Sequence, residues 1–153
     1  CLPVDPYYLS SMMAKKDFKT EVTLAGRKVN DKMLNYIIDE LSNFLNKRNK
    51  SLKNSKIMIV GLTYKGGVAD MRNSLNFKIF NKIKKYNNKT DGCDPFVEEK
   101  TKVSYGIYNK INKNIKYDVI LFLSHHDYFK KIFKNIILSR NRNEVLDPFN
   151  YYS

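Results

Sequence analysis

Two short apolar runs, Lys56–Leu62 and Tyr117–Leu123, constrain the fold of this chain more than any other feature. Each run predicts a strand that is buried on both faces of a sheet. Apolar residues at helical spacing follow each run, at 74–86 and 126–138. Weaker strand patterns occur at 89–94 and 144–147. This alternation predicts an α/β fold in which a parallel sheet carries helices on both faces.

Residues 1–50 have a different pattern, which is helical throughout. A first helix is expected to begin near Asp5, with this residue as its N-cap and Pro6 in the first turn. A second is expected over 21–29, and Asn30 is expected to cap a third. The third helix carries an apolar stripe that must pack on the rest of the chain or on a second subunit. The stripe consists of Met33, Leu34, Ile37, Ile38, Leu41, Phe44 and Leu45.

The polar segment 47–55 is interpreted as a linker between these two parts. We therefore divide the chain into a helical segment, 1–50, and an α/β domain, 51–153. No apolar stretch approaches the roughly 20 residues that a membrane span needs, so no membrane association is expected. The two cysteines, Cys1 and Cys93, make no disulfide framework, which favours a cytoplasmic protein. Neither belongs to a metal-binding spacing, so no metal is expected, and Cys93 is expected to serve packing.

The chain of 153 residues carries a net charge of +13, which raises the possibility of a nucleic-acid partner. However, only five of its 28 basic residues are arginines, and the lysines are scattered over every segment. Specific readers of bases and phosphates favour arginine, whose fork makes paired hydrogen bonds. A basic nucleic-acid-binding domain therefore stays an alternative, while an anionic nucleotide would also benefit from this charge.

The loop after the first predicted strand is a candidate anion site. Gly61 and Gly66-Gly67 let the backbone approach a ligand, and Lys65 and Arg72 add positive charge. Asn73 or Ser74 can cap the following helix. The loop has no GxGxxG spacing, so from the residues alone the phosphate signal is weak, and a tight turn with solvated charges is the alternative interpretation. The pair His125-His126, before Asp127, is interpreted as structural or peripheral, since no third ligand has a suitable spacing.

Two motifs resemble a known family. The run Cys1-Leu2-Pro3-Val4-Asp5-Pro6-Tyr7-Tyr8-Leu9 resembles the cysteine loop of the UDP-glucose/GDP-mannose dehydrogenases, and is most similar to the branch acting on UDP-N-acetylhexosamines. The run Gly61-Leu62-Thr63-Tyr64-Lys65, followed by Asp70-Met71-Arg72-Asn73-Ser74, resembles the segment that opens the family's C-terminal domain. The order of the two motifs implies a Rossmann-like domain preceded by the end of the central dimerisation domain.

The resemblance also implies an activity. The family oxidises the C6 alcohol of a UDP-sugar to a uronic acid with two NAD, through a cysteine thiohemiacetal and thioester. Cys1 is then the expected nucleophile, and Asp5 the residue that orients water. Tyr64 and Lys65 are expected to contact the UDP-sugar, and Arg72 the pyrophosphate of NAD. Val4 departs from the lysine of other branches, so an alkoxide must be stabilised by other groups.

The expected partners follow from the same resemblance. They are the UDP-sugar, an N-terminal NAD-binding domain that this sequence does not contain, and a second copy in a homodimer. We thus interpret the chain as the C-terminal fragment of an enzyme, inactive alone. A non-catalytic nucleotide-binding module is the other alternative. Asp70 is expected to orient Arg72 or Lys65.

Overall fold

A computed structural model describes residues 4–112, 114–130, 133–134 and 144–151. Cys1 and most of the second half of the helix expected at 126–138 lie outside these residues. The chain forms two compact units, Cys1–Tyr36 and Ile37–Ser153, which divide within one helix. The functional division at residue 50 stays a prediction.

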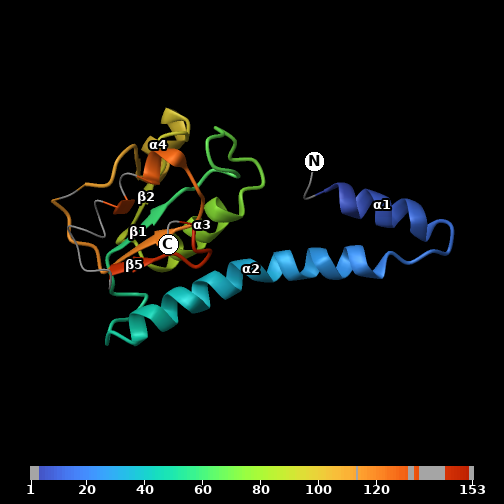
Figure 1. Cartoon of the computed structure of the whole chain (residues 1–153), viewed down its shortest axis with the longest axis horizontal. Coiled ribbons are helices and arrows are strands. Elements are labelled where there is room, and N and C mark those ends of the chain that lie inside the picture. Colours follow the sequence, from blue (N-terminus) through green and yellow to red (C-terminus); the bar gives the residue numbers. More distant parts are fainter. Residues whose placement is uncertain (1–3, 113, 131–132, 135–143, 152–153) are drawn as a thin grey trace. The chain divides into compact units, whose positions relative to one another are not determined.

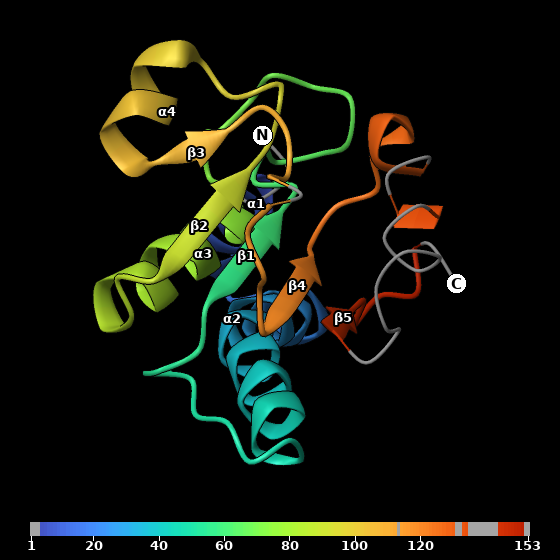
Figure 2. The same ribbon diagram turned by 90° about the vertical axis from the view of Figure 1, so that its left-hand side faces the viewer.

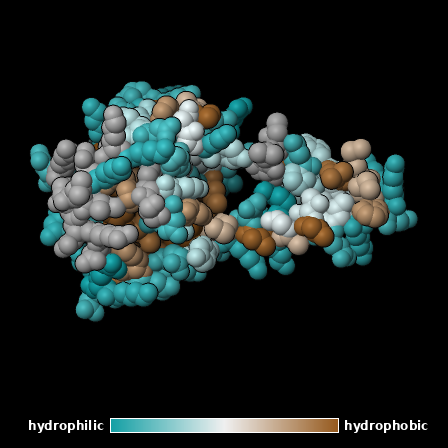
Figure 3. All heavy atoms as spheres, in the orientation of Figure 1, coloured by the Kyte–Doolittle hydropathy of each residue, from teal (hydrophilic) through white to brown (hydrophobic). Residues whose placement is uncertain are grey.

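The first unit contains α1 (Asp5–Ala14) and the beginning of α2 (Glu21–Asn46). Tyr7 donates a hydrogen bond from its hydroxyl to Asp31 Oδ2 at 3.2 Å, which connects the two helices. None of the residues 4–36 is buried, and large apolar side chains remain at the surface (Figure 3). The described part of this unit therefore lacks a core of its own.

Two expectations for the helical part are wrong. The N-cap of α1 is Val4, without a side-chain cap, and Asp5 is the first helical residue. There its carboxylate still interacts favourably with the helix dipole. The second and third helices are one continuous helix, α2, with Asn30 in its interior. No proline interrupts this helix. The ion pair between Arg27 and Asp31, at 3.3 Å, spans the expected break at Asn30 and supports a continuous helix there.

The second unit is built on a five-stranded sheet with the order β3-β2-β1-β4-β5, in which every neighbouring pair is parallel (Figures 1 and 2). The strands are β1 (Ile57–Val60), β2 (Thr90–Cys93), β3 (Ile107–Tyr108), β4 (Val119–Phe122) and β5 (Val145–Leu146). The predicted parallel α/β fold is confirmed. The sequence patterns missed α4 (Glu99–Tyr105) and β3, because both elements are short.

Both faces of the sheet are covered. On one face α3 (Leu75–Tyr86) places Phe80 beside Gly92 of β2, where a Cβ atom would collide with the ring. On the other face Phe129 and Phe133 meet Phe122 of β4 edge to face, at 6.5 and 5.1 Å between ring centroids. Burial of each such side chain contributes about 1.5–3 kcal/mol. The core of the unit thus lies on both sides of β1 and β4.

The apolar stripe of α2 packs within the second unit. Ile37, Leu41 and Leu45 are fully buried there, which decides between the two partners that the sequence left open for this part of the stripe. The segment expected as a linker, 47–55, is also bound to the sheet. Lys50 pairs with Asp118 at 2.6 Å, and Asn87 Nδ2 donates to the carbonyl oxygens of Leu52 and Ser55 at 2.7 Å.

Candidate functional site

The strand order reverses between β1 and β4. From β1 the chain adds β2 and β3 on one side, and then β4 and β5 on the other side. In open parallel sheets, ligands bind beyond the carboxyl ends of the strands at such a switch point. The loop after β1, residues 61–74, and the turn after β4, residues 123–126, both begin at this edge. These two segments are therefore the expected position of a binding site.

The loop after β1 is closed by its own backbone. Tyr64 N donates to Asp70 O at 2.7 Å, and Val68 N donates to Lys65 O at 3.3 Å. The side chain of Tyr64 is 41% exposed, and Lys65 is exposed next to it. The loop thus presents an aromatic ring and an ammonium group to solvent from a fixed backbone.

Arg72 and Asp70 form an exposed ion pair at the far end of the loop. The guanidinium donates from Nε to Asp70 Oδ1 at 3.1 Å and from NH2 to Oδ2 at 2.9 Å. The hydrogen bonds from Arg72 lower the pKa of Asp70 to about 2. The expected partnership of these two residues is confirmed. Ser74 caps α3 by accepting from Phe77 N at 3.2 Å, also as expected.

Asp94, which follows β2, is buried behind this loop. Its Oδ2 accepts from Leu62 N at 2.8 Å, from Thr63 N at 3.0 Å and from Thr63 Oγ1 at 3.1 Å, and its Oδ1 accepts from Phe96 N at 2.9 Å. Burial alone would raise the pKa of this carboxyl, but the hydrogen bonds and the nearby His126 hold the pKa below its usual range. The carboxylate therefore anchors the first residues of the loop.

His126, which follows β4, is buried against the same carboxylate. Its Nε2 lies 3.6 Å from Asp94 Oδ2. The structural interpretation of His126 agrees with this position, but no pattern in the sequence connects it with Asp94. Asp94 directly follows β2 and His126 lies four residues after the end of β4, and this placement beyond the carboxyl ends of two strands is the signal that could have found them.

The glycines of the loop allow it to lie against the turn after β4. A Cβ atom at Gly66 would overlap the carbonyl oxygen of His125, and one at Gly61 would overlap Ser124 Oγ. Gly61 also has a φ of +84°, a backbone conformation that other residues rarely adopt. Close contact between the two segments thus requires glycine at both positions.

The site does not fit a dinucleotide bound in the usual Rossmann manner. There the amides after β1 and the N-terminus of the next helix hold the pyrophosphate. In this chain the amides of Leu62 and Thr63 are taken by Asp94, and Ser74 caps α3. A phosphate at these amides would also meet the carboxylate of Asp94. An anion can instead reach the outer side of the loop, where Lys65 is exposed.

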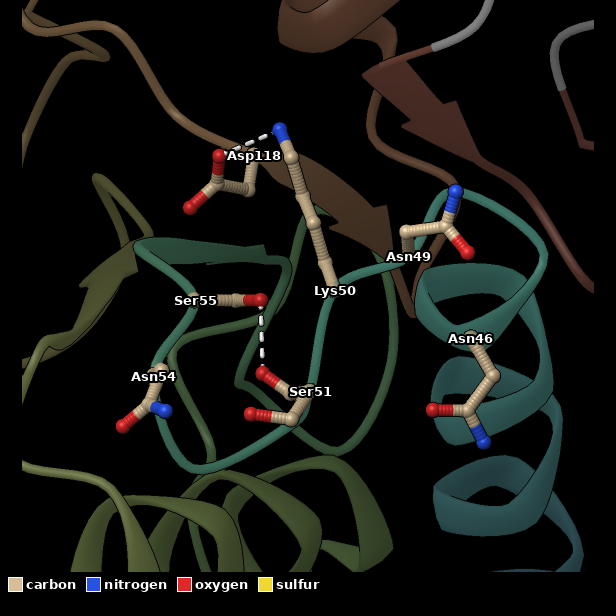
Figure 4. Close-up of a pocket in the computed structure, with 7 residues that line it drawn as sticks. All are labelled: Asn46, Asn49, Lys50, Ser51, Asn54, Ser55 and Asp118. Atoms are coloured by element: carbon tan, nitrogen blue, oxygen red, sulfur yellow. Dashed lines mark hydrogen bonds and ion pairs between the residues drawn. The ribbon is translucent and has the colours of Figure 1, made fainter.

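A pocket of about 490 Å³ lies at the opposite, amino-terminal edge of the sheet (Figure 4). Its lining is Asn46, Asn49, Lys50, Ser51, Asn54, Ser55 and Asp118. The two charged residues, Lys50 and Asp118, pair with each other, so the pocket offers no net charge to a diphosphate. It is not the site that the loop residues form.

The two remaining residues that the sequence analysis singled out, Asp5 and Cys93, belong to other parts of the chain than this loop. Asp5 is exposed at the start of α1 and belongs to the first unit. Cys93 is buried in the core, and burial, followed by the charge of Asp94, raises the pKa of its thiol to about 12, as suits a packing residue. Over the described ranges no three His, Cys, Asp or Glu residues cluster as metal ligands would, and no helix is long and apolar enough to cross a membrane.

Comparison with known proteins identifies the domain. Residues 58–153 match the UDP binding domain of the UDP-glucose/GDP-mannose dehydrogenase family. The chain belongs to this family. The match begins within β1 and includes the loop, Asp94 and His126, so the candidate site lies entirely in the family's UDP binding domain.

Individual relatives agree with this assignment. The UDP-N-acetyl-D-glucosamine 6-dehydrogenase of Salmonella typhi is 34% identical over 86% of this chain, which covers 32% of that protein. The UDP-N-acetyl-D-mannosamine dehydrogenase of Pyrococcus horikoshii is 30% identical over 97% of this chain and 35% of its own length. A solved structure of the Pyrococcus UDP-D-ManNAc dehydrogenase superposes with a TM-score of 0.79, at 26% identity, over the whole chain and 35% of that structure. The chain therefore spans about a third of the length of these relatives.

Proposed function

We propose that this chain binds a UDP-sugar in an NAD-dependent UDP-sugar 6-dehydrogenase, and that the sugar is a UDP-N-acetylhexosamine. The observation that carries the proposal is the exposed Tyr64-Lys65 pair on a loop fixed at the switch point of a UDP binding domain. The relatives' names, which specify N-acetylglucosamine and N-acetylmannosamine, support the choice of sugar.

Lys65 suits the diphosphate because its ammonium group forms charge-assisted hydrogen bonds with phosphate oxygens. Tyr64 can supply an aromatic face or a hydroxyl hydrogen bond to the nucleoside or the sugar. Arg72 is the candidate contact to the pyrophosphate of NAD, and Asp70 holds its guanidinium in a fixed orientation. NAD itself needs another domain, because the amides after β1 are taken by Asp94.

In the complete enzyme the Cys1 thiolate would attack the C6 aldehyde, which forms when the C6 alcohol gives a hydride to a first NAD, and the resulting thiohemiacetal would give its hydride to a second NAD to become a thioester. Asp5 orients the water that hydrolyses the thioester. The nearby helix start supports a thiolate, since Pro6 lies in the first turn of α1 and the dipole favours negative charge at this end. We further propose that residues 1–50 complete a dimerisation domain and that the active enzyme is a homodimer.

Titration of the 153-residue chain with UDP tests the binding step. We expect calorimetry to show binding that Lys65→Ala weakens by about 1–3 kcal/mol, roughly 5- to 150-fold in Kd. Lys89→Ala is the matched control, because it removes the same charge from an exposed position at the other edge of the sheet. Equal losses in the two variants, or no binding at millimolar UDP, would contradict the proposal.

Two alternative functions are distinguished by different measurements. A basic nucleic-acid-binding domain would bind random DNA as tightly as UDP, with strong salt dependence. A non-catalytic nucleotide-binding module would bind UDP but would lack oxidation in the complete protein.

Oxidation is tested in a complete protein that includes the NAD-binding domain. We expect NADH formation with UDP-N-acetylglucosamine or UDP-N-acetylmannosamine, and Cys1→Ser should abolish the uronic acid product, because a hydroxyl is a far weaker nucleophile than a thiolate. Unchanged acid formation by this variant would show that Cys1 is not the nucleophile.

A further inference from the structure

His126 makes a second contact that connects it with the loop after β1. Gly67 N donates a hydrogen bond to His126 Nδ1 at 2.9 Å. A backbone N–H can only donate, so Nδ1 must be without a proton. In the neutral ring the proton then lies on Nε2, which faces Asp94 Oδ2 at 3.6 Å and Thr63 Oγ1 at 3.4 Å. The contacts thus fix the tautomer of this histidine.

The ring of His126 is also held in place by its aromatic neighbours. Phe96 stacks on it, with 5.1 Å between ring centroids and 11° between the ring planes. Phe129 meets it edge to face at 5.3 Å. The side chain of His126 is completely buried, so it cannot itself touch a ligand on the outer side of the loop. Any influence on binding must act through residues that His126 contacts, and Gly67 is the loop residue that donates a hydrogen bond to its ring.

The loop is therefore anchored on both sides of its exposed residues. Asp94 holds Leu62 and Thr63 before them, and His126 holds Gly67 after them. Tyr64 and Lys65 lie between the two anchors. A loop that is ordered in advance loses less conformational entropy when a ligand binds, and this raises its affinity.

We propose that His126, held by Asp94, is a positioning residue for UDP: by accepting the hydrogen bond of Gly67 it keeps Tyr64 and Lys65 in the arrangement that binds the nucleotide. This inference rests on the proposed UDP site. A histidine that does not contact the ligand would thereby affect the affinity for UDP.

Two substitutions separate this role from simple packing. In His126→Asn the side-chain oxygen takes the place of Nδ1 and can still accept from Gly67 N. In His126→Gln the amide group reaches toward Asp94, in the place of Nε2, but no acceptor remains at the δ position. We expect His126→Asn to retain UDP affinity within about threefold, and His126→Gln to lose on the order of tenfold, as for one lost hydrogen bond.

Phe133→Leu is the control for lost packing. It removes an edge-to-face contact with Phe122 and part of the core, but none of the contacts described above for His126. We expect it to lower the melting temperature while UDP affinity stays near that of the unmodified chain. Loss of affinity in parallel with melting temperature across the three variants would overturn the proposal.

The amide of Gly67 reports the anchor without a ligand. In ¹H–¹⁵N spectra of the free chain, we expect hydrogen exchange at Gly67 to stay slow in His126→Asn and to become faster in His126→Gln. If the unmodified chain binds no UDP, the proposed function fails. If it binds UDP but both variants behave alike, only the role of His126 fails. Should both variants unfold, the ¹⁵N shifts of His126 in the unmodified chain decide, because a proton on Nδ1 would overturn the proposal.

Discussion

Asp94 shows how a carboxylate that is itself buried can shape an exposed loop. Its two oxygens accept four hydrogen bonds, which bind the start of the loop after β1 and the residue Phe96 to the end of β2. A buried charge is stabilised only where such partners replace the lost water. The negative charge of Asp94 therefore contributes to folding as well as to the shape of the loop.

The lowered pKa of Asp94 predicts how stability depends on pH. The unfolded chain has the higher pKa, about 3.9, so the stability from this group is present above pH 4 and is lost as the pH falls through the folded value. We expect Asp94→Asn to be less stable by about 2–4 kcal/mol at pH 7, because Asn brings N–H groups toward the N–H donors of Leu62 and Thr63.

Urea denaturation followed by circular dichroism at several pH values checks this prediction. The stability of Asp94→Asn should fall less between pH 5 and pH 3 than that of the unmodified chain. Asp39→Asn, at an exposed position of α2, is the control for loss of a carboxylate. A variant with unchanged stability at pH 7, or with the same pH dependence as the unmodified chain, would show that Asp94 does not hold the loop by its charge.

At the scale of elements, α2 carries two kinds of apolar residue. From Ile37 onward the stripe is buried in the second unit, at Ile37, Leu41 and Leu45. Before Tyr36, Val22 is 88% and Val29 62% accessible to solvent. The two valines are seven residues apart and so share one face of the helix, where exposed apolar side chains can form a protein–protein interface. We therefore expect the surface that contacts the second copy in the proposed homodimer to lie before residue 37.

Substitutions before and after residue 37 should change different properties, self-association in the first case and folding stability in the second. We expect Ile37→Lys to unfold the second unit or to destabilise it by about 3 kcal/mol or more, because it buries an unpaired charge. Val22→Lys combined with Val29→Lys should leave stability nearly unchanged but shift the chain from dimer toward monomer. Light scattering and thermal denaturation distinguish these results. A monomeric unmodified chain at high concentration would contradict the expected interface.

At the scale of the whole chain, the sequence by itself determined the more strongly patterned elements. The periods of the apolar residues indicated α3 and the buried strands β1 and β4, and hence the parallel sheet, because each period reflects which side chains share a face. Local chemistry gave the cap of α3 by Ser74 and the pair of Asp70 with Arg72, since these partners lie two or three residues from their acceptors or donors. The resemblance of two motifs gave the family, which the match to residues 58–153 confirms.

Only the tertiary structure decided how the loop is held. Asp94 is 31 residues from Thr63, and His126 is 63 residues from it, so no local pattern connects them. They meet because the order β3-β2-β1-β4-β5 places the ends of β2 and β4 on either side of β1. The same packing buries Ile37 and Leu41 in the second unit, a choice that helical spacing left open. Periodicity shows which face of an element is apolar, but the order of the strands determines which neighbour covers it.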